Sequence, residues 1–121
     1  MITPIYAALL TLLLPVLLLR VVRLRWVTKI GIGDGGHSGL TKAIRVHANF
    51  VETVPWVLIL MMLQEQMHAN PLWLHFYGSA LILARLAHAW GLSHSAGTTP
   101  GRAIGILLTL ILMIAGAVNC L

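Results

Sequence analysis

Charged residues are scarce in this sequence, and acidic residues are almost absent. Of the 121 residues, 9% are charged and only three are acidic, whereas charged residues make up about a quarter of an ordinary soluble domain. The hydrophobic fraction of 59% excludes an intrinsically disordered chain, and the single cysteine, Cys120, excludes a secreted module held by disulfides. A water-soluble globular domain is therefore not expected, and one compact membrane domain, residues 1–121, is the interpretation.

Four long apolar segments account for most of the chain. We expect transmembrane helices at residues 3–22, 42–63, 71–92 and 100–120, because about 20 apolar residues cross the hydrocarbon core of a bilayer as a helix. The second and third connections are short, so consecutive helices should be antiparallel neighbours. The sequence thus predicts an all-α integral membrane protein, built as an up-down bundle of four transmembrane helices.

The basic residues cluster around the first connection. Six of the eight lie there: Arg20, Arg23, Arg25, Lys29, Lys42 and Arg45. Cytoplasmic loops of membrane proteins are rich in Lys and Arg, so this connection should face the cytoplasm and both termini the opposite side. The window lacks the interleaved aromatic residues of a surface that binds single strands, and no nucleic-acid partner is expected.

The second apolar segment carries several polar residues. Arg45, Asn49 and Glu52 share one helix face, while His47 lies on a different side. A lone carboxylate inside a hydrophobic span costs several kcal/mol unless it is paired. Either Arg45 or Arg85 could be the partner of Glu52, and a structural ion pair between Glu52 and Arg85 is our prediction. Such ions can also do no more than hold helices together.

Arginines outnumber the carboxylates that could pair with them in the apolar segments. The five concerned are Arg20, Arg23, Arg45, Arg85 and Arg102. Because guanidinium groups match carboxylates in bidentate geometry, this excess favours an anionic ligand. The histidines His47 and His88 could contact a ligand, act as acid or base, or be packing residues. The Cys and His spacing matches no known metal site, so no metal is expected.

Small residues open the fourth segment. Gly101 and Gly105 form a G-x-x-x-G pattern, which lets two helices approach closely, either within one subunit or between subunits.

The polar residues of the second segment follow the spacing R-x-H-x-N-x-x-E-x-x-P, from Arg45 to Pro55. This pattern resembles the signature of the MAPEG superfamily, the membrane-associated proteins of eicosanoid and glutathione metabolism. Arg23 near the end of the first segment, and Arg85 and His88 in the third, follow the family in order and in approximate spacing. The short chain and its Gly-Asp-Gly-Gly loop resemble the small bacterial inner-membrane branch.

The resemblance implies a homotrimer that binds glutathione in clefts between subunits, near the cytoplasmic face. The residues carried over as glutathione contacts are Arg23, Arg45, His47, Asn49, Glu52 and His88. Arg102 would stabilise the glutathione thiolate, which attacks a small lipophilic electrophile entering from the bilayer lipids. The sequence departs from the family one turn beyond His88, where many family enzymes have a tyrosine and this chain has Gly91 and Leu92.

Two functions are compatible with these residues and with the resemblance. The first is a glutathione-dependent transferase or peroxidase acting on lipophilic electrophiles. The second is a non-catalytic membrane protein that binds a lipid or a small anion, in which the glutamate and the arginines form a structural network.

Overall fold

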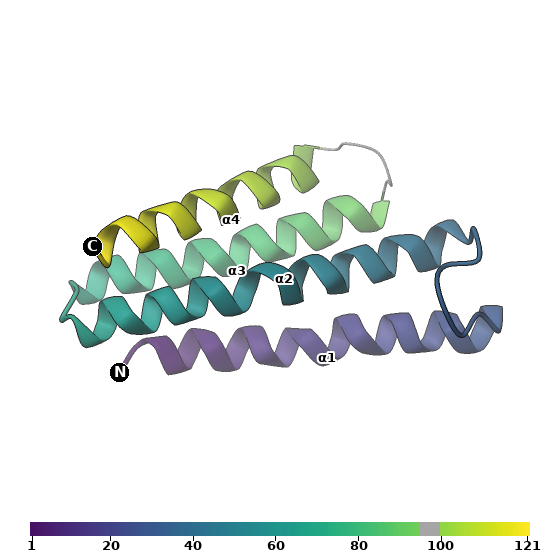
Figure 1. Ribbon diagram of the computed structural model, residues 1–121, viewed down its shortest axis with the longest axis horizontal. Coiled ribbons are helices and arrows are strands. Elements are labelled where there is room, and N and C mark those ends of the chain that lie inside the picture. Colours follow the sequence, from purple (N-terminus) through teal and green to yellow (C-terminus); the bar gives the residue numbers. More distant parts are fainter. Residues whose placement is uncertain (95–99) are drawn as a thin grey trace.

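The computed structural model describes residues 1–94 and 100–121, and over these residues the protein is a bundle of four helices (Figure 1). The helices are α1 (Thr3–Thr28), α2 (Ser38–Gln66), α3 (Pro71–His94) and α4 (Pro100–Asn119). Consecutive helices run in opposite directions along one long axis, so both termini and the α2–α3 connection lie at one end of the bundle. The connection between α1 and α2 lies at the other end. The predicted all-α up-down bundle is thereby confirmed.

The helix bounds differ from the predicted ones mainly around the first connection. α1 extends six residues beyond the predicted residue 22, and α2 begins at Ser38 instead of residue 42. The predicted third connection, residues 93–99, falls largely on residues 95–99, which lie outside the described part of the chain.

Three of the helices in the described residues are long and apolar enough to cross a membrane: α1, α2 and α4. α3, which the sequence also predicted to span, has 24 residues but does not meet that standard of apolarity. It packs against all three other helices and carries buried polar residues, among them Arg85 and His88. The face of α3 that packs against these helices can carry polar groups that a lipid-facing surface could not hold.

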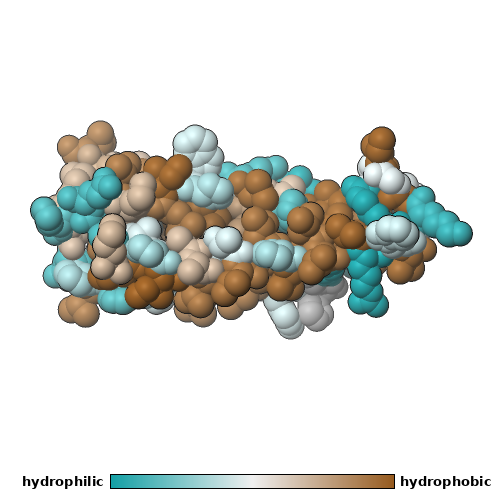
Figure 2. All heavy atoms as spheres, turned by 90° about the horizontal axis from the view of Figure 1, so that it is seen from below, coloured by the Kyte–Doolittle hydropathy of each residue, from teal (hydrophilic) through white to brown (hydrophobic). Residues whose placement is uncertain are grey.

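The surface has the distribution expected of a protein embedded in lipid. Figure 2 shows hydrophobic residues over the middle of the molecule and hydrophilic residues concentrated at its two ends. Large apolar side chains such as Leu12, Leu83 and Ile114 are each more than 60% exposed. An apolar surface of this kind is stable in contact with lipid acyl chains, because burying it inside the protein would gain no hydrophobic free energy.

The polar ends of the bundle satisfy the free backbone groups of the helices. At the termini, the carboxylate of Glu65 accepts hydrogen bonds from the backbone N–H groups of Ile2 and Thr3, where α1 begins. At the opposite end, His37 Nδ1 accepts from the N–H of Leu40 at 3.0 Å and caps α2. Each bond supplies an acceptor to a helix N-terminus, which has none of its own.

The loop before α2 is held by Asp34. Its carboxylate accepts from Thr41 Oγ1 at 2.6 Å and from the N–H of Gly36 at 2.9 Å. These two hydrogen bonds, that to Thr41 above all, lower the pKa of Asp34 below its usual value.

The G-x-x-x-G pattern brings α4 against α3 within the same subunit. A Cβ added to Gly105 would lie 2.6 Å from the carbonyl oxygen of Ala84 and 2.7 Å from the Cβ of His88. A Cβ at Gly101 would lie 3.2 Å from the nearest atom, the Ala87 carbonyl oxygen. The absence of a side chain at Gly105 therefore sets the distance between the two helices beside His88.

We expect Gly105→Ala to lower thermal stability in detergent, with Gly101→Ala as the matched control. Both variants gain about 1 kcal/mol of helix propensity. A Cβ at Gly105 forces α3 and α4 apart, at a cost of about 1 to 3 kcal/mol, whereas a Cβ at Gly101 requires its neighbour to move by only a few tenths of an ångström. Thermal unfolding followed by circular dichroism should therefore give a lower midpoint for Gly105→Ala than for Gly101→Ala. Equal midpoints would show that α3 and α4 do not rely on this close contact.

Candidate functional site

The strongest concentration of buried polar groups lies where α2, α3 and α4 meet. Arg85 is 2% exposed, His88 1% and Thr109 2%. Asn49, half-buried on α2, completes the group. We refer to Asn49, Arg85, His88 and Thr109 as the polar core.

Arg85 is the centre of the polar core. Its Nη2 donates to Asn49 Oδ1 at 2.6 Å and lies 3.2 Å from His88 Nδ1, while its Nη1 donates to Thr109 Oγ1 at 3.3 Å. The Thr109 hydroxyl in turn donates to the carbonyl oxygen of Gly105 at 2.7 Å. One arginine thus connects three helices.

This buried cation has only neutral partners in the described part of the chain. No carboxylate is among its hydrogen-bond partners there, and its Nε is buried without an acceptor. A buried charge held by neutral dipoles alone is expensive and is usually retained for a reason other than stability. The polar core therefore connects three helices and also contains a positive charge that no carboxylate of the described residues balances.

The structure pairs Glu52 with Arg45 and not with Arg85, which corrects the predicted structural ion pair. Glu52 Oε2 lies 3.9 Å from Arg45 Nη2, and their side chains are 59% and 51% exposed. Both side chains lie on the outward side of α2, whereas Asn49 from the same predicted face reaches Arg85. Residues predicted to share one helix face can thus lie partly toward the bundle interior and partly toward the outside, because such a face is wide.

The remaining predicted glutathione contacts are distributed over two regions. His88 belongs to the polar core, and His47 is half-buried on α2. Arg23 is exposed beside a pocket of about 460 Å³ where the end of α1 meets the start of α2. The pocket lining consists of Val16, Leu19, Arg20, Arg23, Leu24 and Gly39.

The predicted catalytic residue, Arg102, lies at the start of α4 beside an apolar groove. This groove has a volume of about 290 Å³. It is lined by Arg102, Ala103, Ile106, Leu107 and Leu110. The groove provides one cation next to a lipid-facing apolar surface.

Thr109 is the member of the polar core that was not predicted from the sequence. It lies four residues after Gly105, on the buried face of α4 that also includes Leu112 and Gly116. The sequence did contain one indication of its position: Thr109 is a hydroxyl residue in an apolar helix, and it continues the four-residue spacing of Gly101 and Gly105. Residues that could hold a metal do not gather in the described ranges 1–94 and 100–121, where no group of three His, Cys, Asp or Glu side chains is found.

Two comparisons relate this chain to known proteins. The model of the MAPEG family matches residues 3–121. The inner membrane protein YecN of Escherichia coli K12 is 40% identical over 94 residues, covering 78% of this chain and 72% of the relative. The protein of the same name from Escherichia coli O6:H1 matches with the same identity and coverage.

The position of Asn49 predicts a specific loss of stability. Asn49→Ala removes the acceptor of the 2.6 Å bond and leaves a buried cation short of a partner, so the unfolding free energy should fall by about 1.5 to 3 kcal/mol. Thr53→Val is the control, because the Thr53 hydroxyl donates only to the Asn49 carbonyl of its own helix, and its loss should matter by less than about 1 kcal/mol. Thermal or denaturant unfolding in detergent measures both. Similar losses in the two variants would contradict the central position of Arg85.

Proposed function

Because this chain belongs to the MAPEG family and is a membrane protein, we propose that it is a homotrimer that binds glutathione and transfers it to lipophilic electrophiles. In this proposal the glutathione sites lie between subunits, at the membrane face that carries the basic connection between α1 and α2. That face is cytoplasmic and both termini are on the opposite side, because basic loops are retained in the cytoplasm.

The observation that carries the proposal is the exposed pair Arg45 and Glu52 on α2. The two charges lie on the outward side of a helix that is apolar enough to span the membrane, and both are more than half exposed in a single subunit. Charges exposed to acyl chains are costly, so another subunit or a polar ligand must cover this side of α2. A cleft between subunits that contains a polar ligand meets that requirement.

Glutathione matches the charges available in this region. It carries two carboxylates and one ammonium group, which need several cations and one carboxylate from the protein. Glu52 would accept from the ammonium, and Arg45 and Arg23 would bind the carboxylates. Arg45 and Glu52 could each exchange their mutual 3.9 Å contact for shorter bonds to the ligand.

Asn49 and His88 would contact the ligand from the side of the polar core. Because Asn49 Oδ1 already accepts from Arg85, the amide Nδ2 is the group left to donate to a ligand carboxylate. The uncompensated charge of Arg85 behind them adds to the attraction for an anion. His47, half-buried on α2, would complete the set.

Arg102 would act on the thiol. A nearby guanidinium lowers a thiol pKa by favouring the thiolate. The thiolate sulfur then forms a bond to the electrophilic carbon, and the electron pair of the broken bond departs with the leaving group. The apolar groove beside Arg102 would receive the lipophilic electrophile. Without a tyrosine one turn beyond His88, Arg102 carries this role by itself.

One observation favours the second candidate, a non-catalytic protein that binds a lipid or a small anion. Arg45 and Glu52 pair with each other, and the hydrogen bonds of Arg85 within the described residues go to side chains of its own chain. A network of this kind can hold helices in place without any ligand.

Calorimetric titration of glutathione into the detergent-purified trimer distinguishes the two functions. We expect micromolar to millimolar binding, weakened about tenfold or more by Glu52→Gln or Arg45→Gln, because each removes a charged hydrogen-bond partner. A thiol-free glutathione analogue should bind like glutathione. Lys29→Gln, which removes a cation just after the end of α1 that is not among the proposed contacts, should bind glutathione like the unaltered protein.

Two results would favour the non-catalytic function instead. One is the absence of heat from any glutathione titration of the folded protein. The other is a loss of thermal stability in Glu52→Gln without an effect on glutathione affinity. A monomeric mass in detergent by light scattering would contradict the trimer.

The role of Arg102 gives a separate prediction for turnover. With a nitro-substituted aryl chloride as electrophile, Arg102→Gln should lower kcat at neutral pH about tenfold or more and change glutathione affinity little. Raising the pH should restore part of the rate, since the thiol then ionises without help from the guanidinium. Arg102→Lys, which keeps the charge, should lose less. A rate in Arg102→Gln equal to that of the unaltered enzyme would remove Arg102 from the mechanism.

A further inference from the structure

The last turns of α1 form a stripe that is apolar at one end and cationic at the other. Leu18, Val22 and Arg25 follow each other at helical spacing on one face of α1, Trp26 lies beside them, and Lys29 follows directly after the helix as its C-cap. Leu18 is 45% exposed, Val22 38% and Trp26 80%. None of these residues belongs to the glutathione site proposed above.

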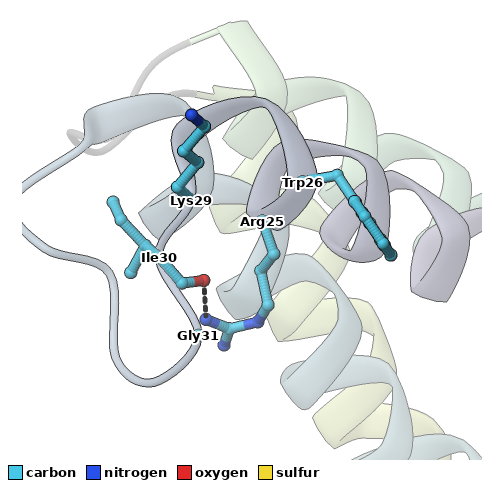
Figure 3. Close-up of a pocket in the computed structure, with 5 residues that line it drawn as sticks. All are labelled: Arg25, Trp26, Lys29, Ile30 and Gly31. Atoms are coloured by element: carbon cyan, nitrogen blue, oxygen red, sulfur yellow. Dashed lines mark hydrogen bonds between the residues drawn. The ribbon is translucent and has the colours of Figure 1, made fainter.

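The cationic end of the stripe contains a pocket of about 290 Å³, lined by Arg25, Trp26, Lys29, Ile30 and Gly31 (Figure 3). Arg25 Nη1 donates to the carbonyl oxygens of Ile30 at 3.2 Å and Gly33 at 2.9 Å. Both bonds use the same nitrogen, so Nη2 and Nε remain to donate to a ligand. The guanidinium is thus fixed in position before any ligand binds.

The backbone at the end of α1 supports the same site. Lys29 ends the helix in the left-handed conformation, with φ 58°, and in Figure 3 its flexible side chain extends in the direction opposite to the Arg25 guanidinium. The acidic residue in this loop, Asp34, is bound to Thr41 and Gly36. The two cations of the pocket therefore have no carboxylate partner among the described residues near them.

We propose that this stripe binds an anionic phospholipid. The phosphate accepts from Nη2 and Nε of Arg25, and the flexible Lys29 side chain turns toward it from the other side of the helix end. The Trp26 ring lies at the level of the glycerol esters, and one acyl chain follows Val22 and Leu18. Arginine and lysine both bind phosphate, and tryptophan concentrates at the boundary between headgroups and acyl chains. A soluble phosphate would make no use of the apolar part of the stripe, whereas a membrane lipid fits both parts at once.

Tryptophan quenching by brominated lipids tests the proposal in reconstituted vesicles. The full-length protein is placed in phosphatidylcholine vesicles containing brominated phosphatidylglycerol or, for comparison, brominated phosphatidylcholine. The contribution of Trp26 is the quenching that disappears in Trp26→Phe. We expect Trp26 to show a preference for phosphatidylglycerol, with each cation contributing roughly a fivefold factor in relative affinity.

The variants separate a defined site from general attraction. Lys29→Gln should lower the preference about fivefold, Arg25→Lys should lower it less than Arg25→Gln, and Lys42→Gln, a cation at the start of α2 outside the pocket, should leave it unchanged. Equal quenching by both brominated lipids would overturn the proposal. So would an equal effect of Lys42→Gln and Lys29→Gln, or loss of the preference when millimolar glycerol 3-phosphate is added, which would indicate a soluble phosphate ester as the ligand.

Discussion

A buried arginine without a carboxylate partner among the described residues governs the interior of this protein. Arg85 on α3 holds Asn49 on α2 and Thr109 on α4 through its guanidinium, and His88 lies against the same group. Each bond goes to a neutral group, so these contacts do not cancel the positive charge itself. The helices around it are placed to satisfy this one side chain, and Gly105 lets α4 come near enough for Thr109 to reach it.

The outer and inner faces of α2 divide the remaining chemistry. Asn49 faces the polar core, while Arg45 and Glu52 lie outward on a surface that is otherwise apolar. A helix arranged in this way has polar groups on both its inner and its outer side. In a single subunit surrounded by lipid, the outer charges would cost free energy because they would face acyl chains. Membership of the MAPEG family agrees with this arrangement, because it makes the chain a membrane protein.

The helices could be predicted from the sequence, but their contacts could not. Apolar runs of about 20 residues indicated all four elements, since run length responds directly to bilayer thickness. The extension of α1 to Thr28 was missed because the basic segment from Arg23 onward was interpreted as a loop, although cations are favourable at a helix C-terminus. The sequence left Arg45 and Arg85 as possible partners of Glu52, and the choice of Arg85 was wrong. The partner depends on the rotation of α2 about its axis, which tertiary packing determines and a single sequence does not specify.

The contact of Glu65 with the start of α1 affects the order in which the protein can be built. Ile2 and Thr3 donate to a carboxylate more than 60 residues later in the chain, at the far end of α2. During synthesis α1 enters the membrane with these N–H groups still dependent on water, because their acceptor does not yet exist. Only when α2 has crossed back is the first helix completed. The first helix therefore depends on the second for the acceptor at its own N-terminus.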